Sequence, residues 1–79
     1  MNEGMNEGKV KWFDEERGYG FIRPFKRGDD VFVHIEDVKG AGYKTLGAGD
    51  LVEYNIHSGN DGKDRAIDIV KFEYVYEEE

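Results

Sequence analysis

The feature that most limits the fold is the way glycine divides the chain into short segments. Eleven glycines interrupt every stretch that is long enough for a stable helix, and the apolar residues between them follow no helical period. Five short segments instead have the composition and alternation typical of strands. These segments are residues 9–13, 18–22, 31–35, 51–57 and 65–70. The longer stretch 36–50 is expected to hold one helical turn near residues 36–39 and otherwise to be loop.

Five short strands without covering helices must avoid leaving exposed edges, and closing the sheet into a small barrel does this. The chain has 79 residues, which is too few for two separate cores. Gly18 and Gly20 fall on the same face as Ile22, and bare positions there let a strand coil sharply over a small core. The sequence therefore predicts an all-β, five-stranded antiparallel barrel.

Aromatic side chains share one face of two neighbouring predicted strands. Alternation puts Tyr19 and Phe21 on one face of the second strand, and Phe32 and His34 on one face of the third. Glycine and aliphatic residues occupy the opposite faces. The alternative is that the rings form the core, but one small core cannot bury both faces of two adjacent strands. We therefore expect these four rings to face solvent.

Cations border the predicted aromatic face. Arg17 lies on it, and Lys9 and Lys11 join it if Val10 points inward. Exposed rings are unfavourable unless they have a partner. Single-stranded nucleic acid suits both features, because bases stack on rings for about 1–3 kcal/mol each while Lys and Arg follow the phosphates.

The side chain of Trp12 is harder to place. Strict alternation after Lys11 buries Trp12 and exposes Phe13, whereas a bulge or strong coiling at the strand end exposes both.

The net charge of −7 opposes general binding to polyanions, but the charge is uneven. Residues 1–44 carry −1 and residues 45–79 carry −6, which together give −7, while residues 8–27 hold six basic and three acidic side chains. Acidic groups on a distant face are largely screened at physiological salt. The total charge therefore does not exclude a local nucleic-acid site, although a mixed-charge solvated surface is the simpler interpretation of charge alone.

Three ordered segments resemble the bacterial-type cold-shock protein family: Gly-Lys-Val-Lys-Trp-Phe at 8–13, Arg-Gly-Tyr-Gly-Phe-Ile at 17–22, and Asp-Val-Phe-Val-His at 30–34. The second and third are similar to the family's two ribonucleoprotein motifs, and the loop at 40–46 also matches. The resemblance covers roughly residues 8–70. It implies an OB-fold barrel that binds single-stranded RNA and DNA, with some preference for pyrimidine-rich strands. It also implies an RNA chaperone and, in some members, a transcription antiterminator or translational regulator.

The resemblance assigns roles by position. The side chains that it implies stack on bases are Trp12, Tyr19, Phe21, Phe32, His34 and Tyr43. Those that it places near phosphates or base edges are Lys9, Lys11, Arg17 and Lys44, with Phe13 at the border of the patch.

Three positions depart from the family pattern. Ile35 replaces a usual aromatic residue, which removes one stacking platform, and Glu36 and Asp14 add negative charge where Ser and Asn are common. These changes predict weaker binding than in a typical member. The basic loop 23–28, which carries Phe25, either extends the site or is an exposed hairpin turn.

Other kinds of chemistry find little support. Ser58 directly follows His57, so their side chains diverge in a strand, and no other pair suggests nucleophilic catalysis. His34 and His57 lack the tight spacing of a metal site, and the chain has no cysteine. We therefore expect no enzyme, no metal and no cofactor. Two rival hypotheses are a protein-interaction module that uses the aromatic face or the C-terminal strand, and a barrel that no longer binds nucleic acid.

The chain divides into a flexible acidic leader (1–7) with a doubled Met-Asn-Glu-Gly, a cold-shock domain (8–71) and an acidic, Tyr-rich extension (72–79). The extension either pairs with the edge of a second copy, giving a homodimer, or frays. No apolar run exceeds three residues and the N-terminus lacks an apolar signal segment, so a cytoplasmic protein without membrane contact is expected.

Overall fold

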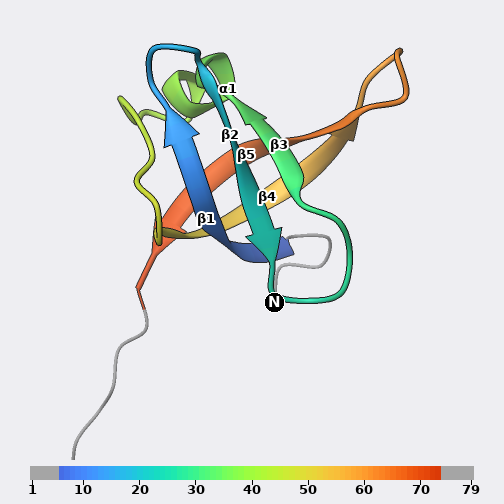
Figure 1. Ribbon diagram of the computed structural model, residues 1–79, viewed down its shortest axis with the longest axis horizontal. Helices are drawn as coiled ribbons and strands as arrows, with labels where there is room; N and C mark the ends of the chain where they lie inside the picture. Colours follow the sequence, from blue (N-terminus) through green and yellow to red (C-terminus); the bar gives the residue numbers. More distant parts are fainter. Residues whose placement is uncertain (1–5, 74–79) are drawn as a thin grey trace, which may run out of the picture.

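The computed structural model describes residues 6–73, which form five strands and one short helix (Figure 1). The elements are β1 (Asn6–Asp14), β2 (Tyr19–Pro24), β3 (Val31–His34), α1 (Ile35–Gly40), β4 (Leu51–Ser58) and β5 (Asp64–Phe72). β1 starts three residues earlier than predicted, so Asn6 and Glu7 of the predicted leader belong to the sheet. Most of the predicted C-terminal extension, including its proposed dimer contact, lies outside the described residues.

The strands close into a barrel in the order β1-β2-β3-β5-β4, with β4 pairing back to β1. This confirms the predicted five-stranded barrel. Four of the strand pairs are antiparallel, but β3 and β5 run parallel where Phe32 lies beside Arg65. This parallel seam is the one exception in an otherwise antiparallel barrel.

The core lies inside the barrel and is built from the aliphatic faces of the strands. The predicted alternation is confirmed in β2 and β3, where Ile22 and Val33 are fully buried and the intervening residues are not. Helix α1 places Val38 in the same core. The buried residues are Val10, Ile22, Val31, Val33, Val38, Leu46, Val52, Tyr54, Ala66 and Ile69.

Strand β4 departs from its predicted pattern at Ile56. Alternation puts Val52, Tyr54 and Ile56 on one face, and the first two are buried, but the side chain of Ile56 is 43% exposed. Beyond Ile56, the β4–β5 hairpin continues past the barrel and projects from its body (Figure 1). Ile56 itself pairs with the buried Ala66, and its side chain lines the open groove beside the β2–β3 loop, which leaves it accessible.

A bulge in β5 changes which of its residues face the core. The register shifts between the pairs Glu53–Val70 and Asn55–Ile67, so β5 carries one extra residue. Asp68 has a left-handed φ of 55°, a conformation that Asp adopts more readily than most residues. Its carboxylate accepts a hydrogen bond of 3.1 Å from the Asn55 side chain. The bulge lets both Ala66 and Ile69 face inward, although they are three residues apart.

Gly20 is required by the close approach of β1 and β2. A Cβ at this position would meet the Phe13 Cα at 2.8 Å and the Trp12 carbonyl more closely still. These are backbone atoms, which cannot move aside without shifting the strand. We therefore expect Gly20→Ala to lower the free energy of unfolding by about 1–3 kcal/mol, measured by urea denaturation.

Gly40 provides the matched control for this substitution. It ends α1, and a Cβ there would meet nothing within 4 Å. Gly40→Ala should leave stability unchanged or raise it by up to about 1 kcal/mol. Equal losses in the two variants would contradict the role assigned to Gly20.

Because Tyr54 is buried, we expect the stability of the fold to decrease at alkaline pH. Desolvation raises the pKa of its phenol above the ordinary value of 10.0. The unfolded chain therefore loses this proton first, so the contribution of the neutral phenol is complete below pH 10 and falls as the pH rises further. We expect the thermal midpoint to drop more between neutral pH and about pH 11 in the wild type than in Tyr54→Phe. An equal drop in both proteins would contradict this account.

Candidate nucleic-acid interface

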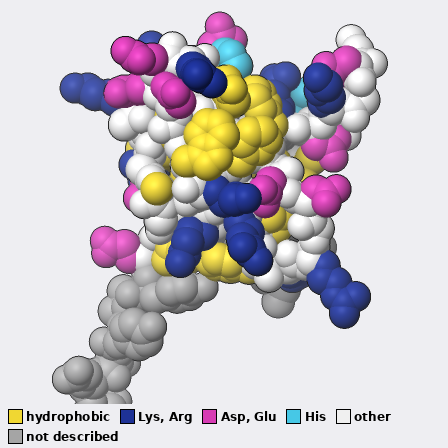
Figure 2. Space-filling model, viewed as in Figure 1, with side chains coloured by type: hydrophobic (Ala, Val, Ile, Leu, Met, Phe, Trp, Pro, Cys, Tyr) yellow, Lys and Arg dark blue, Asp and Glu magenta, His cyan; other side chains and the backbone are white. Residues whose placement is uncertain are grey.

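Five rings form a continuous layer on the outward face of β1, β2 and β3. Cross-strand pairing sets Phe21 beside Phe32, Tyr19 beside His34, and Trp12 beside Phe21. The ring centroids of Trp12 and Phe21 are 5.4 Å apart, those of Tyr19 and Phe32 are 5.8 Å apart and stacked, and His34 follows at 6.3 Å from Phe32. We call these five residues the ring cluster, and an exposed hydrophobic patch marks this face of the molecule (Figure 2).

A bulge in β1 explains how Trp12 joins the ring cluster. Val10 pairs with Ile22 but Trp12 pairs with Phe21, so Lys11 is an extra residue without its own partner. Lys11 and Trp12 are consequently both exposed, and Trp12 retains 41% of its accessible surface. Phe13 turns back and packs against the core. Of the alternatives left open by the sequence, the bulge is present, but it exposes Trp12 without exposing Phe13 to the same degree.

His34 is held in place by the start of α1. Its Nδ1 accepts a hydrogen bond of 3.1 Å from the Glu36 backbone N–H, which makes His34 the N-cap of the helix. An imidazole that accepts at Nδ1 carries its proton at Nε2 when neutral. The end of the ring cluster therefore has an oriented ring with a hydrogen-bond donor at its far edge.

Two of the predicted cations near the rings are paired with carboxylates. The Lys11 Nζ lies 2.8 Å from Asp30, and the Arg17 Nε lies 3.6 Å from Asp14. Asp14 also accepts backbone hydrogen bonds from Glu16 and Arg17. The departure at Asp14 thus stabilises the turn before β2, and its charge is partly offset by Arg17.

A further cation on this face comes from the basic segment 23–28, which the sequence offered as one possible extension of the site. Arg23 is exposed and lies directly across from Lys9 in the β1–β2 ladder. Figure 2 shows Lys and Arg side chains gathered next to the hydrophobic patch. The sequence signal was available, because Tyr19, Phe21 and Arg23 follow one another at the two-residue period of a strand. The sequence predicts Arg23 in a loop, whereas it lies in β2.

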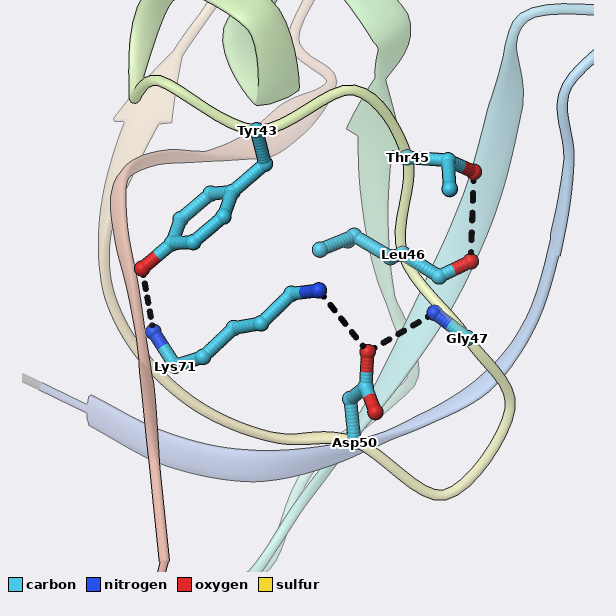
Figure 3. A network of polar contacts seen from close by, with 6 residues as sticks. All are labelled: Tyr43, Thr45, Leu46, Gly47, Asp50 and Lys71. Carbon is cyan, nitrogen blue, oxygen red and sulfur yellow. Dashed lines mark hydrogen bonds and ion pairs between the residues drawn. The ribbon is translucent and has the colours of Figure 1, made fainter.

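Tyr43 lies apart from the ring cluster and is held against β5 (Figure 3). Its hydroxyl accepts a hydrogen bond of 2.9 Å from the Lys71 backbone N–H, and the Lys71 Nζ lies 4.9 Å from its ring centroid. The same Nζ is 3.3 Å from Asp50, which also accepts the Gly47 backbone N–H at 2.8 Å. Tyr43 is half-buried and Lys44 beside it is exposed. These two predicted residues are not brought into the ring cluster.

The hollows beside the rings are shallow. One of ≈ 240 Å³ is lined by Phe32, His34, Glu36, Asp37 and Arg65, with the Arg65 Nε 3.0 Å from the Asp37 carboxylate. Within residues 6–73, no three His, Asp or Glu side chains converge to hold a metal ion. Over the same residues, no helix has the length and apolarity needed to cross a bilayer. An open, ring-lined surface of this kind suits flat ligands that stack on it.

Known proteins are similar to this chain along most of its length. Cold shock protein CspB of Bacillus caldolyticus is 49% identical over 67 residues, which is 85% of this chain and 98% of that protein. Cold shock-like protein CspC of Escherichia coli K12 is 48% identical over 56 residues, or 71% of this chain and 81% of that protein. Glycine-rich protein 2 of Nicotiana sylvestris is 41% identical over 63 residues, but the match spans only 29% of that longer protein.

Residues 6–72 match the family described as the 'Cold-shock' DNA-binding domain. The match includes the three strands that carry the ring cluster and the two that complete the barrel. The chain therefore belongs to the cold-shock domain family, whose members bind nucleic acids and are not enzymes.

Proposed function

We propose that the ring cluster binds single-stranded RNA and DNA and that the protein acts as an ATP-independent RNA chaperone. The observation that carries this proposal is the unbroken series of rings, exposed at Trp12 and partly exposed at the others, that crosses three strands and is bordered by cations. Unpaired bases stack on such rings, whereas a duplex keeps its bases stacked inside. Binding therefore favours the open form of an RNA hairpin, and the free energy of stacking drives the opening.

The chemistry of the surface sets its specificity. Every base has a π-face, so stacking accepts many sequences, and the family resemblance adds a preference for pyrimidine-rich strands. Phosphate contacts from Lys9, Lys11 and Arg17 add a salt-dependent contribution. Tyr43 and Lys44 remain predicted contacts outside the ring cluster. Regulation of transcription or translation would follow if the protein opened hairpins in nascent or messenger RNA.

The structure favours nucleic acid over a protein partner on this face. A protein-binding patch of large apolar residues is usually depleted of Lys at its centre. Here Lys11 lies beside Trp12 in the bulge, and Lys9 is on the same strand. Cations interleaved with rings suit a ligand that alternates flat apolar groups with anions, which is the chemistry of a single strand.

Removing one ring should weaken binding without unfolding the barrel. Phe21 contacts both Trp12 and Phe32 but is not part of the buried core. We expect Phe21→Ala to lower affinity for a short oligothymidine roughly 5- to 150-fold, as the loss of one stack of about 1–3 kcal/mol requires. Fluorescence anisotropy of a labelled oligonucleotide measures this directly, and circular dichroism follows the fold.

Val70→Ala is the control, because Val70 is an exposed apolar residue on β5, outside the three strands that carry the rings. Its affinity should match the wild type. Wild-type binding should quench the fluorescence of Trp12, the only tryptophan, with single strands and not with duplex. Quenching by neither, or undiminished affinity in Phe21→Ala, would leave the protein-interaction hypothesis as the better account.

A further inference from the structure

Two cations face each other across β1 and β2 without a neutralising partner. Lys9 and Arg23 are directly opposed in the ladder and both are exposed. Within residues 6–73, no carboxylate lies within 4.0 Å of either charged group. Like charges directly opposite each other destabilise a sheet. A bound anion between them would remove this repulsion.

The other cations of the barrel behave differently. Lys11, Arg17, Arg65 and Lys71 each lie within 4.0 Å of an aspartate. The cations that lack such a partner in the described part of the chain therefore include a local group at one end of β2. This group consists of Lys9, Arg23, Lys26 and Arg27.

The β2–β3 loop continues this group beyond the strand. Its exposed residues include Lys26, Arg27 and Phe25, whose ring is 45% exposed. The Phe25 backbone N–H donates a hydrogen bond of 2.9 Å to the Glu7 carbonyl, which ties the start of the loop to β1. The loop lines a groove of ≈ 400 Å³. The carboxylates on this groove are Glu7, Asp29, Asp30 and Asp64, of which Asp30 is paired with Lys11.

The group also lies in line with the ring cluster. Tyr19, Phe21 and Arg23 point outward from the same face of β2, each about 6.8 Å further along the strand. In β1, Lys9 is exposed on the same outward side of the strand as Trp12. A single strand stacked on Trp12 and Phe21 that continues along β2 therefore passes next over Lys9 and Arg23, and then over the loop.

We propose that Lys9, Arg23 and the β2–β3 loop form a phosphate-binding extension of the site, which holds nucleotides that no longer stack on the ring cluster. This inference rests on the proposed function. The extension lengthens the bound segment and compensates for the aromatic residue that Ile35 replaces at the opposite end. Its contribution is electrostatic, so it depends on salt more steeply than stacking does.

The test compares Arg23→Glu with Lys63→Glu, using oligothymidines of about four and about nine nucleotides. Both variants change the net charge equally, and Lys63 lies in the projecting turn between β4 and β5. Arg23→Glu should lower affinity for the longer strand about five- to tenfold and leave the shorter strand within about twofold. The slope of log affinity against log salt for the longer strand should fall by roughly 0.7 or more. Lys63→Glu should change none of these values beyond about twofold.

A stability measurement separates this role from a structural one. Glutamate at position 23 replaces a repulsive pair with an attractive one opposite Lys9, so the thermal midpoint of Arg23→Glu should stay the same or rise while its binding falls. Arg23→Gln, which removes the charge without reversing it, should show a smaller loss of affinity of about two- to fivefold.

Two results would overturn the extension: equal losses in Arg23→Glu and Lys63→Glu, or equal losses for the short and long strands. If the wild type binds neither oligonucleotide, the proposed function itself is wrong. Wild-type binding of the short strand with no gain from length would refute the extension alone.

Discussion

The closure of a very small barrel is the constraint on which the rest of the structure depends. A barrel of five short strands has one interior, and aliphatic residues such as Ile22 and Val33 fill it completely. Within residues 6–73, no second layer covers the outer face of β1, β2 and β3, so the rings that alternate with these residues remain outside (Figure 1). Exposure of the ring cluster is therefore a geometric consequence of core size, and the binding surface follows from the same alternation that builds the core.

The parts of the fold that could be predicted from sequence are those where one regular period applies. Alternation in β2 and β3 placed Tyr19 and Phe32 correctly, and all five expected strands are present, although β1, β2 and β5 extend beyond their expected ends. The predictions failed or remained open where the backbone changes period, at the bulges near Lys11 and Asp68. A bulge has no reliable sequence signal, because it is set by how two strands curve around a shared core. Ile56 shows a related limit, since alternation gives the face on which a side chain lies but not whether another element covers that face.

The electrostatics show why net charge was a poor guide to the site. The excess of acidic residues suggests a surface that repels polyanions, yet the structure uses several aspartates in local roles. Asp14 caps a turn and pairs with Arg17, while Asp50 pairs with Lys71 and accepts a loop N–H. Each such pair cancels one cation as well as one carboxylate. What decides the local potential is which cations are left over, and this information is in the contacts and not in the composition.

The two ends of β2 also differ in how many of their side chains are held by contacts within the protein. At the α1 end, Ile35 packs against the core, where its Cγ2 leaves only 3.1 Å for a Cβ on Gly18, and Tyr43 is fixed to Lys71. Ile35 and Tyr43 at that end therefore contact other parts of the protein and stabilise the helix and the loop that follows it. At the other end of β2, the charged groups of Lys9 and Arg23 have no carboxylate within 4.0 Å in residues 6–73. The bulge in β1 exposes Trp12 nearby. These two cations, which no aspartate in that part of the chain neutralises, therefore lie at the end of β2 that carries Arg23, opposite the end that meets α1.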